Sequence, residues 1–540
     1  MNSWLAKLWR RKSPPAAEQT RLPPALDAAL ECKQAHLILP AWQTALQQVP
    51  ECFDAALAEA QRLGWSEREL HRLRAYGHYY RGEIEAAFEL ARDDGLSFDA
   101  QRFNAGLFLL TVSCLYYRGQ FDEAWRALQE IEARHAAVLH GRADFWQSKA
   151  ALLLAKARLN ETWQALTRAR ELAPEDAGLA MSAYALAFDL ERWPEFAQLE
   201  QEIAAGRYGE KLNAFALAKP YLMRHDYRQG FALLEGRYRQ ADAHHYVNPA
   251  LPAERRCIGR AKDFPAGKTL LLTCEQGFGD TLMMARYWPL LHRLTEGRLI
   301  VEVQSELLSL MQANFPAMRL VARAHGQAPP VGFDFWLGAM SLPYFFDHTA
   351  QEIPGKGGFL VAPEENLVYW RSRLAELAPQ GLRVGLAWSG NPRHLNDGIR
   401  SIPFALLASH LAVPAGLTFI ALQTTGLPSN PPAGLQLVSE ELVSYADTAA
   451  LIALLDLVIT VDTSVVHLAG SLGKETWLLF PYRYEWRWGL EGETNCWYDT
   501  VKVLRQSTHG AWAPLLDEVF HHRLLAFCTS RQEEKSHGMV

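Results

Sequence analysis

The sequence predicts a helical repeat region followed by two α/β lobes, and three observations support this fold class. In the first half of the 540 residues, a short motif recurs at intervals typical of helical repeats. In the second half, apolar β-branched runs alternate with helical patterns, which indicates parallel sheets with crossover helices. The strongest such run, at 457–461, ends abruptly in Asp462, Thr463 and Ser464, and a small-residue helical pattern follows at once.

The composition excludes several broad classes of protein. The formal net charge of −6 gives no support for nucleic-acid binding. No apolar run reaches the roughly 18 residues of a transmembrane helix, so we expect no membrane span. The seven cysteines are scattered, and none form a CxxC pair. Neither a disulfide framework nor a zinc site is therefore predicted, which fits a cytoplasmic protein.

We expect six segments along the chain. They are an N-terminal tail (1–30), helical repeats (31–240), a connector (241–267), a first lobe (268–380), a second lobe (381–515) and a C-terminal helix and tail (516–540). The first 12 residues are basic and include two Trp and two Leu, but they lack the apolar core of a signal peptide. They form either a frayed terminus or a weak membrane-surface anchor.

The repeat is visible in the motif Tyr-Tyr-Arg-Gly. It occurs at 79–82 and again 37 residues later at 116–119. The same phase continues at Ala157, Glu191 and His225, with spacings of 38, 34 and 34 residues. A 34-residue period is that of tetratricopeptide repeats, and residues 60–240 resemble them.

Stacked helix pairs of this kind form a concave groove. The groove either binds an extended acceptor or partner, or the helices only support the second half. The tyrosines of the repeated motif likewise have two possible roles: they either line the groove or form the core between helices. They are Tyr79, Tyr80, Tyr116 and Tyr117.

The α/β half is predicted from its strands. Candidates are 269–274, 299–303 and 333–337 in the first lobe, and 383–388, 417–422, 457–461 and 475–480 in the second, with a bridging helix at 365–377. Ligands of such folds lie beyond the carboxyl ends of the strands. Polar residues follow several of these predicted strands, so we expect these residues to lie close together beyond the carboxyl ends of the strands.

In the first lobe, the junction contains Gly277, Gly279 and Asp280, before a helix predicted at 281–294. Glycines let a backbone approach a ligand closely. Asp280 is either a helix N-cap or a catalytic base. The segment is not a phosphate-binding Walker loop, because no Gly-Lys-Ser/Thr follows.

The second lobe has more such junctions. Its candidate substrate-binding residues are Ser389, Gly390, Asn391, Arg400, Ser401, Gln423, Asp462, Thr463, Ser464, His467 and Arg487. Arg400 has the planar fork that clamps phosphate groups. Asp462 is alternatively an N-cap, and His467 alternatively satisfies a buried carbonyl.

These motifs resemble the heptosyltransferase-like glycosyltransferases (glycosyltransferase family 9). The resemblance lies in 277–280 with 285–287 and in 461–474, and it extends to 385–391, 400–403, 486–488, 496–498, 505–506, 226–231 and 236–238. It implies the GT-B architecture of two Rossmann-like lobes and an inverting, metal-independent enzyme without a cofactor. The layout of repeats before such lobes is also that of protein O-glycosyltransferases.

The resemblance also implies roles for individual residues. Asp280 matches the proposed base, Asp462 would hold sugar hydroxyls, and Thr463 and Ser464 would hold the donor diphosphate. Ser464 stands where the family usually has Gly, and the segment around Arg393 and Asn396 lacks the family's phosphate lysine. The donor is therefore not taken to be ADP-heptose.

Three functions follow as hypotheses. The first is a cytoplasmic glycosyltransferase that transfers a sugar from a nucleotide-sugar to a protein acceptor, such as flagellin or another surface protein, recruited by the repeats. The second is a non-catalytic scaffold with degenerate lobes. The third keeps the enzyme but makes the acceptor a lipopolysaccharide core sugar, which needs no peptide groove.

Overall fold

The computed structural model describes residues 53–96, 103–209, 214–239, 248, 250–323, 327, 329, 331–392, 397–411, 416–482 and 485–537. The predicted tail at 1–30, the first predicted repeat residues up to 52, and Arg393 and Asn396 lie outside this part. Contacts divide the chain into two compact units. The first comprises Met1–Ala216, Gly236–Ala243 and Pro392–Gly398, and the second comprises Leu217–Glu235, His244–Asn391 and Ile399–Val540.

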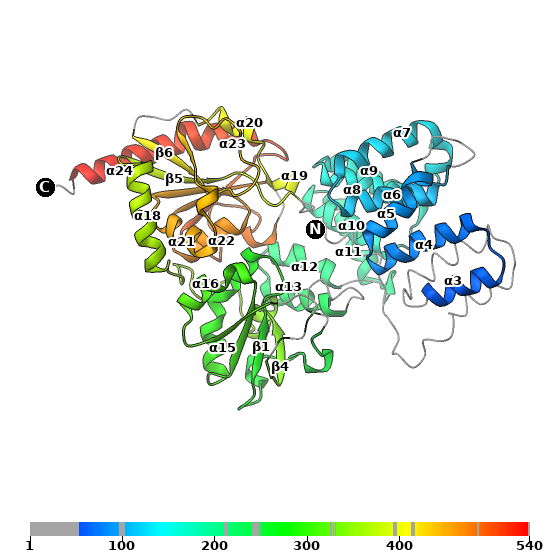
Figure 1. The fold of residues 1–540 in the computed structure, drawn as a ribbon, viewed down its shortest axis with the longest axis horizontal. Helices are drawn as coiled ribbons and strands as arrows, with labels where there is room; N and C mark the ends of the chain where they lie inside the picture. The colour runs from blue at the N-terminus through cyan, green and yellow to red at the C-terminus, as the bar shows by residue number, and fades with distance from the viewer. Residues whose placement is uncertain are drawn as a thin grey trace. The chain divides into compact units, whose positions relative to one another are not determined.

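The first unit is helical, as predicted. From α3 to α12, the helices are α3 (Phe53–Arg62), α4 (Glu67–Arg81), α5 (Ile84–Gly95), α6 (Ala105–Tyr117), α7 (Phe121–Leu139), α8 (Ala143–Ala155), α9 (Leu159–Leu172), α10 (Ala177–Asp189), α11 (Trp193–Ala204) and α12 (Ala214–Met223). From α3 to α11, successive helices pack against each other along the chain (Figure 1). Of α12, the part from Leu217 onward belongs to the second unit, together with α13 (Tyr227–Leu234).

The predicted repeat phase marks sharp turns between helices. Gly82, Gly119, Ala157, Glu191 and His225 all have positive φ, between 56° and 83°. Each follows the end of a helix, and the next helix begins two residues later. Such left-handed residues end helices and reverse the chain, usually with Gly because a Cβ is strained there. The recurrence therefore reports a periodic helix-turn-helix backbone.

The tyrosines of the repeated motif belong to the core of the first unit. Tyr79, Tyr80 and Tyr116 are buried, and only Tyr117 is exposed, at 37%. The rings of Tyr79 and Tyr117 lie 6.0 Å apart in an edge arrangement, and Tyr79 contacts Tyr80 in the same way. Of the two roles predicted for them, the structure shows core packing between helices.

The second unit contains two parallel sheets. The first has the order β3-β2-β1-β4, and the second has the order β10-β9-β8-β5-β6-β7. The strands are β1 (Leu270–Thr273), β2 (Leu299–Val303), β3 (Arg319–Ala322), β4 (Phe335–Gly338), β5 (Leu382–Ala387), β6 (Leu417–Ala421), β7 (Leu435–Leu437), β8 (Leu457–Val461), β9 (Thr476–Phe480) and β10 (Val501–Arg505). Counted within its own lobe, the second sheet has the Rossmann order 3-2-1-4-5-6, and the first has its beginning, 3-2-1-4.

Helices surround both sheets. They are α14 (Phe278–Met284), α15 (Trp288–Leu294), α16 (Ser305–Asn314) and α17 (Leu342–Phe345) in the first lobe, the bridging α18 (Glu364–Leu377), and α19 (Asp397–Arg400), α20 (Phe404–Ala408), α21 (Tyr445–Ala453), α22 (Ser464–Ser471), α23 (Trp512–Asp517) and α24 (Leu524–His537). Helices α14 and α16 of the first lobe pack on α22 and α21 of the second, so the two lobes meet through helices (Figure 1). In the described part of the chain, no helix combines the length and apolarity needed to cross a bilayer.

The predicted elements differ from the structure in detail. The helix predicted at 281–294 is two helices, separated by a 3-10 turn at Ala285–Tyr287, because Pro289 in the first turn of α15 cannot donate a helical hydrogen bond. Strands β3, β7 and β10 were not predicted. β3 is partly exposed, β7 has three residues, and β10 exposes Lys502, so none forms a continuous apolar run.

Left-handed residues with side chains carry strain that glycine relieves. Replacing Glu191, at φ 56°, by Gly is expected to stabilise the protein by about 0.5–1 kcal/mol, because relief of strain exceeds the added entropy of the unfolded chain. The reciprocal change Gly82→Ala, at φ 83°, is expected to destabilise it by about 1 kcal/mol. Urea unfolding followed by circular dichroism measures both, and equal signs for the two changes would contradict the assignment.

Candidate functional site

The second lobe places its polar residues at the switch point of its sheet. Strands β5 and β8 are neighbours, and the chain runs away from them in opposite directions through β6 and through β9. Ligands of such sheets bind at this point, beyond the carboxyl ends of the strands. Ser389 and Gly390 lie just beyond the end of β5, and Asp462 and Thr463 follow β8 directly.

The loop after β5 is held by side chains. The amide of Gln423 bonds both backbone groups of Ser389: its oxygen accepts from the N–H at 3.2 Å, and its nitrogen donates to the carbonyl at 3.0 Å. The N–H of Gly390 donates to the Ser401 hydroxyl at 2.9 Å. No helix begins among residues 388–392, and Asn391 is exposed. Ser389, Gly390, Ser401 and Gln423 therefore shape this loop rather than offer free amides.

The turn after β8 leads directly into α22. Thr463 is the N-cap of this helix, and its hydroxyl accepts from the N–H of Val465 at 3.3 Å. Ser464 begins the helix without positive φ, so the position does not require Gly here. Its hydroxyl accepts from Tyr445 at 2.8 Å. The N-terminus of α22 at the switch point favours an anionic group.

Asp462, the first residue after β8, contacts two arms of the second lobe. Its backbone carbonyl accepts from Arg400 at 3.0 Å, and its carboxylate accepts from the indole of Trp488 at 3.0 Å. Burial and the nearby charge of Glu485 raise the pKa of Asp462 from 3.8 to about 6. Because Thr463 caps α22, Asp462 is not its N-cap. The raised pKa means that the Asp462 carboxyl changes its charge close to neutral pH.

Asp280 comes from the first lobe. It is the third residue of α14, whose N-cap is Gly277, and its carboxylate accepts from the Gly277 N–H at 3.0 Å. Its other oxygen accepts from Arg487 of the second lobe. The N-cap role considered for Asp280 thus falls to Gly277, and Asp280 instead joins the two lobes through an ion pair.

Arg487 is the centre of a buried group of charges. Its guanidinium pairs with Asp280 and with Glu485, the latter at 2.7 Å, and only 12% of its side chain is exposed. Burial lowers the pKa of Arg487, but the three carboxylates of Asp280, Glu485 and Asp462 outweigh it and hold the pKa above its ordinary value. The guanidinium also lies 4.4 Å from the centre of the Trp486 ring.

His467 is neutral and packed. Burial, with the nearby positive charge of Arg487, holds the pKa of His467 well below its ordinary value. Its ring stacks on Trp488, with centres 5.3 Å apart, and its Nδ1 lies 3.1 Å from the hydroxyl of Tyr498. A Cβ at Gly279 would lie 2.6 Å from the His467 ring. Gly279 and His467 therefore set how closely α14 approaches α22.

The sequence predictions did not include Trp488, Glu485, Tyr445 and Tyr498 among the site residues. Trp488 and Tyr498 belong to the aromatic motifs at 486–488 and 496–498, which were the available signal. Arg286, from 285–287, is buried and donates to the carbonyl of Trp497 at 2.6 Å and to that of Pro354 at 3.2 Å. It therefore binds the backbone of two segments, one after the sheet of the first lobe and one between β9 and β10 of the second.

Comparisons with known proteins give distant likenesses. No family model matches the chain. Protein FlbA of Caulobacter vibrioides is 28% identical over 280 residues, which cover 47% of this chain and 46% of FlbA. The chain thus matches about half the length of this curated relative.

Two solved structures are similar at low identity. The ADP-heptose lipopolysaccharide heptosyltransferase II of E. coli is 15% identical, with a TM-score of 0.36, and covers 49% of this chain and 99% of its own. An O-GlcNAc transferase of Thermobaculum terrenum is 12% identical, with a TM-score of 0.29, and covers 78% of this chain and 83% of its own. At TM-scores this low, the Rossmann-like character of the lobes rests on their strand order.

The contact between α14 and α22 can be tested with two neighbouring glycines. Gly279→Ala is expected to destabilise the protein by about 1–3 kcal/mol, because the new methyl group overlaps the packed His467 ring. Gly277→Ala is the matched control, because its Cβ would lie 3.5 Å from its nearest neighbour, the Asp280 carboxylate, and its φ is −71°. Thermal unfolding of both variants measures the loss of stability, and an equal loss of stability in the two variants would contradict the tight contact between α14 and α22.

The raised pKa of Asp462 predicts a pH dependence of stability. A carboxyl whose pKa is higher in the folded state stabilises the protein below its unfolded pKa, and this contribution is lost as pH rises through about 6. The loss is at most about 3 kcal/mol. Asp462→Asn removes it, so the melting temperature of the variant relative to the native protein is expected to increase between pH 4 and pH 7. A pH-independent difference would exclude the shift.

Proposed function

We propose that the two lobes form a glycosyltransferase that takes a sugar from a nucleotide-sugar donor. The observation that carries the proposal is the placement of Asp280, from the first lobe, against Arg487 beside the switch point of the second lobe. A carboxylate, two arginines and a helix N-terminus are the groups that this reaction needs: a base for the acceptor and positive charge for the leaving diphosphate.

The donor diphosphate is assigned to the second lobe. There, the N-terminus of α22 and Arg400 meet at the switch point. In the first lobe, the corresponding place between β1 and β4 is filled by a buried carboxylate, since Glu275 accepts from the N–H groups of Ala339 at 2.7 Å and Met340 at 3.3 Å. A second anion there would meet this negative charge. The first lobe therefore serves the acceptor.

In the proposed reaction, Asp280 takes the proton of an acceptor hydroxyl as the oxygen attacks the anomeric carbon. The bond between that carbon and the donor diphosphate breaks, so the configuration inverts and the nucleotide diphosphate leaves with the electron pair. Arg487 holds Asp280 in the structure. Because a diphosphate is a stronger attraction for a guanidinium than one carboxylate, donor binding would draw Arg487 away and free Asp280 as a base.

Arginines at the switch point also support the metal-independent form of this reaction. Arg400 and Arg487 supply the positive charge that a divalent ion supplies in other transferases. No cofactor beyond the donor is proposed.

We assign the protein acceptor to the helical first unit, with a lipopolysaccharide core sugar as the other acceptor class. Mass spectrometry of surface proteins from a deletion strain distinguishes them, because only a protein acceptor loses a glycan mass.

Substitutions of Asp280 and Arg400 are expected to impair different steps, turnover for Asp280 and donor binding for Arg400. Asp280→Asn should retain binding of the nucleotide-sugar and lose turnover by about 10²–10⁴-fold, the usual contribution of a general base. Arg400→Ala should weaken donor binding about tenfold or more, because it removes a charge beside the diphosphate. Calorimetric titration with a panel of nucleotide-sugars, followed by assays of transfer and donor hydrolysis, separates the two effects.

Lys502→Ala is the charge-matched control for Arg400→Ala, because Lys502 is exposed on β10. Full turnover in Asp280→Asn would remove Asp280 as the base. If no nucleotide-sugar binds the native protein, the lobes are a scaffold and the proposed activity fails.

A further inference from the structure

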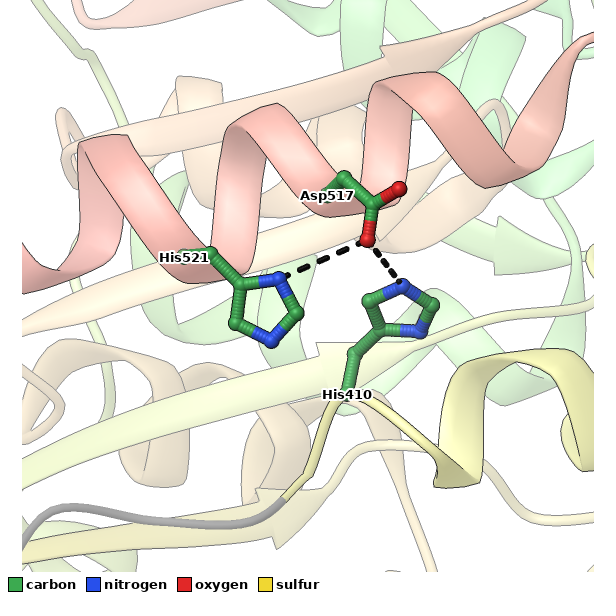
Figure 2. A group of neighbouring side chains, drawn as sticks. All are labelled: His410, Asp517 and His521. Atoms are coloured by element: carbon green, nitrogen blue, oxygen red, sulfur yellow. Dashed lines mark hydrogen bonds and ion pairs between the residues drawn. The ribbon is translucent and has the colours of Figure 1, made fainter.

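Three side chains typical of metal ligands meet in the second lobe, among residues that have no role in the proposed reaction. His410 lies on the segment after α20, Asp517 ends α23, and His521 lies in the π-helix Glu518–Arg523 that follows (Figure 2). One oxygen of Asp517 lies 3.1 Å from Nε2 of His410 and 3.4 Å from Nδ1 of His521. One ligand atom from each of the three residues lies within 4.8 Å of the others.

Hydrogen bonds hold the far nitrogen of the His410 ring. Its Nδ1 lies 3.0 Å from the carbonyl of Leu406 and 3.1 Å from the hydroxyl of Ser409, which itself donates to the same carbonyl at 2.9 Å. The tautomer with its proton on Nδ1 satisfies this carbonyl, and its Nε2 then directs a lone pair towards the Asp517 oxygen, as a metal ligand would. A backbone carbonyl on the far nitrogen is also the usual orienting partner of a metal-binding histidine.

The separations fit one small ion. Ligands at the Zn²⁺–N and Zn²⁺–O distances of about 2.0–2.1 Å stand about 3.3–3.4 Å apart at the corners of a tetrahedron. The two His–Asp separations of 3.1 and 3.4 Å are close to this value. Two imidazoles and one carboxylate suit zinc and the neighbouring first-row metals rather than Mg²⁺ or Ca²⁺, which prefer oxygen ligands.

The supports of the site are partly rigid. The His410 side chain is 8% exposed, whereas those of Asp517 and His521 are 60% and 55% exposed. The His410 ring packs against Phe520, with centres 6.2 Å apart. Asp517 and His521 are four residues apart and face the same side, while the nearby Glu518 is paired with Arg523 at 3.1 Å. Solvent can thus supply the fourth ligand.

We propose that His410, Asp517 and His521 bind one zinc-type divalent cation, with water as the fourth ligand. The ion would connect segments 107 residues apart and fasten the C-terminal helices to the second lobe. The sequence predicted no metal site, and this one is separate from the residues proposed for sugar transfer. Its function is therefore structural, independent of the proposed transferase activity.

The test uses the full-length protein after treatment with a chelator. Isothermal titration with ZnCl₂ is expected to show one zinc per chain, and His521→Ala is expected to weaken this binding at least tenfold. The matched control is His522→Ala, because His522 is the adjacent exposed histidine and is outside the cluster. His521 is itself exposed, so its replacement should leave the metal-free melting temperature unchanged. Loss of folding in one variant cannot then imitate loss of binding.

Cobalt gives a second, spectroscopic readout. Co²⁺ in place of zinc is expected to produce the intense visible absorption of a four-coordinate site, and Asp517→Asn should abolish it. Binding with equal affinity in His521→Ala and the native protein would overturn the proposal. So would absence of zinc binding to the native protein, which would leave the three side chains as an ordinary hydrogen-bonded group.

Discussion

The ion pair between Asp280 and Arg487 is the contact on which the arrangement of the two lobes depends. Asp280 lies in the first turn of α14 in one lobe, and Arg487 lies in the 3-10 turn Trp486–Trp488 of the other. A buried arginine is tolerated only beside anionic groups, which Asp280 and Glu485 supply here. Trp488, next in the chain, donates to Asp462. One turn thereby connects the proposed base to the proposed donor site.

This arrangement gives the proposed reaction a control step. While Arg487 holds Asp280, each oxygen of the carboxylate accepts a hydrogen bond, one from Arg487 and one from the Gly277 N–H, so neither is open to an acceptor hydroxyl. A donor diphosphate would compete for the same guanidinium, so the base would become available when the donor is bound. Such an order keeps the base paired until the donor is in place. The close contact of Gly279 with His467 keeps the two helices at the distance that the ion pair requires.

Much of the fold was predictable because its signals are local. The apolar runs of β5, β8 and β9 marked the central parallel strands, which are buried on both faces. Residues at the repeat phase, such as Gly82 and Glu191, marked the left-handed turns. Strands β3, β7 and β10 were missed because short or partly exposed strands lack an apolar run. The polar residues after β5 and β8 were found, together with their partners Gln423, Ser401 and Arg400, but the partners Trp488 and Tyr445 were not.

The sequence by itself determined the order of the parts: helical repeats, then two lobes with polar residues beyond the ends of their strands. Hydrophobic periodicity and turn residues are properties of neighbours in the chain, so they can be read directly. Only the tertiary structure decided that Asp280 meets Arg487, that burial and Glu485 raise the pKa of Asp462, and that His410 meets Asp517. These effects depend on distance and burial between residues far apart in sequence, which no local pattern specifies.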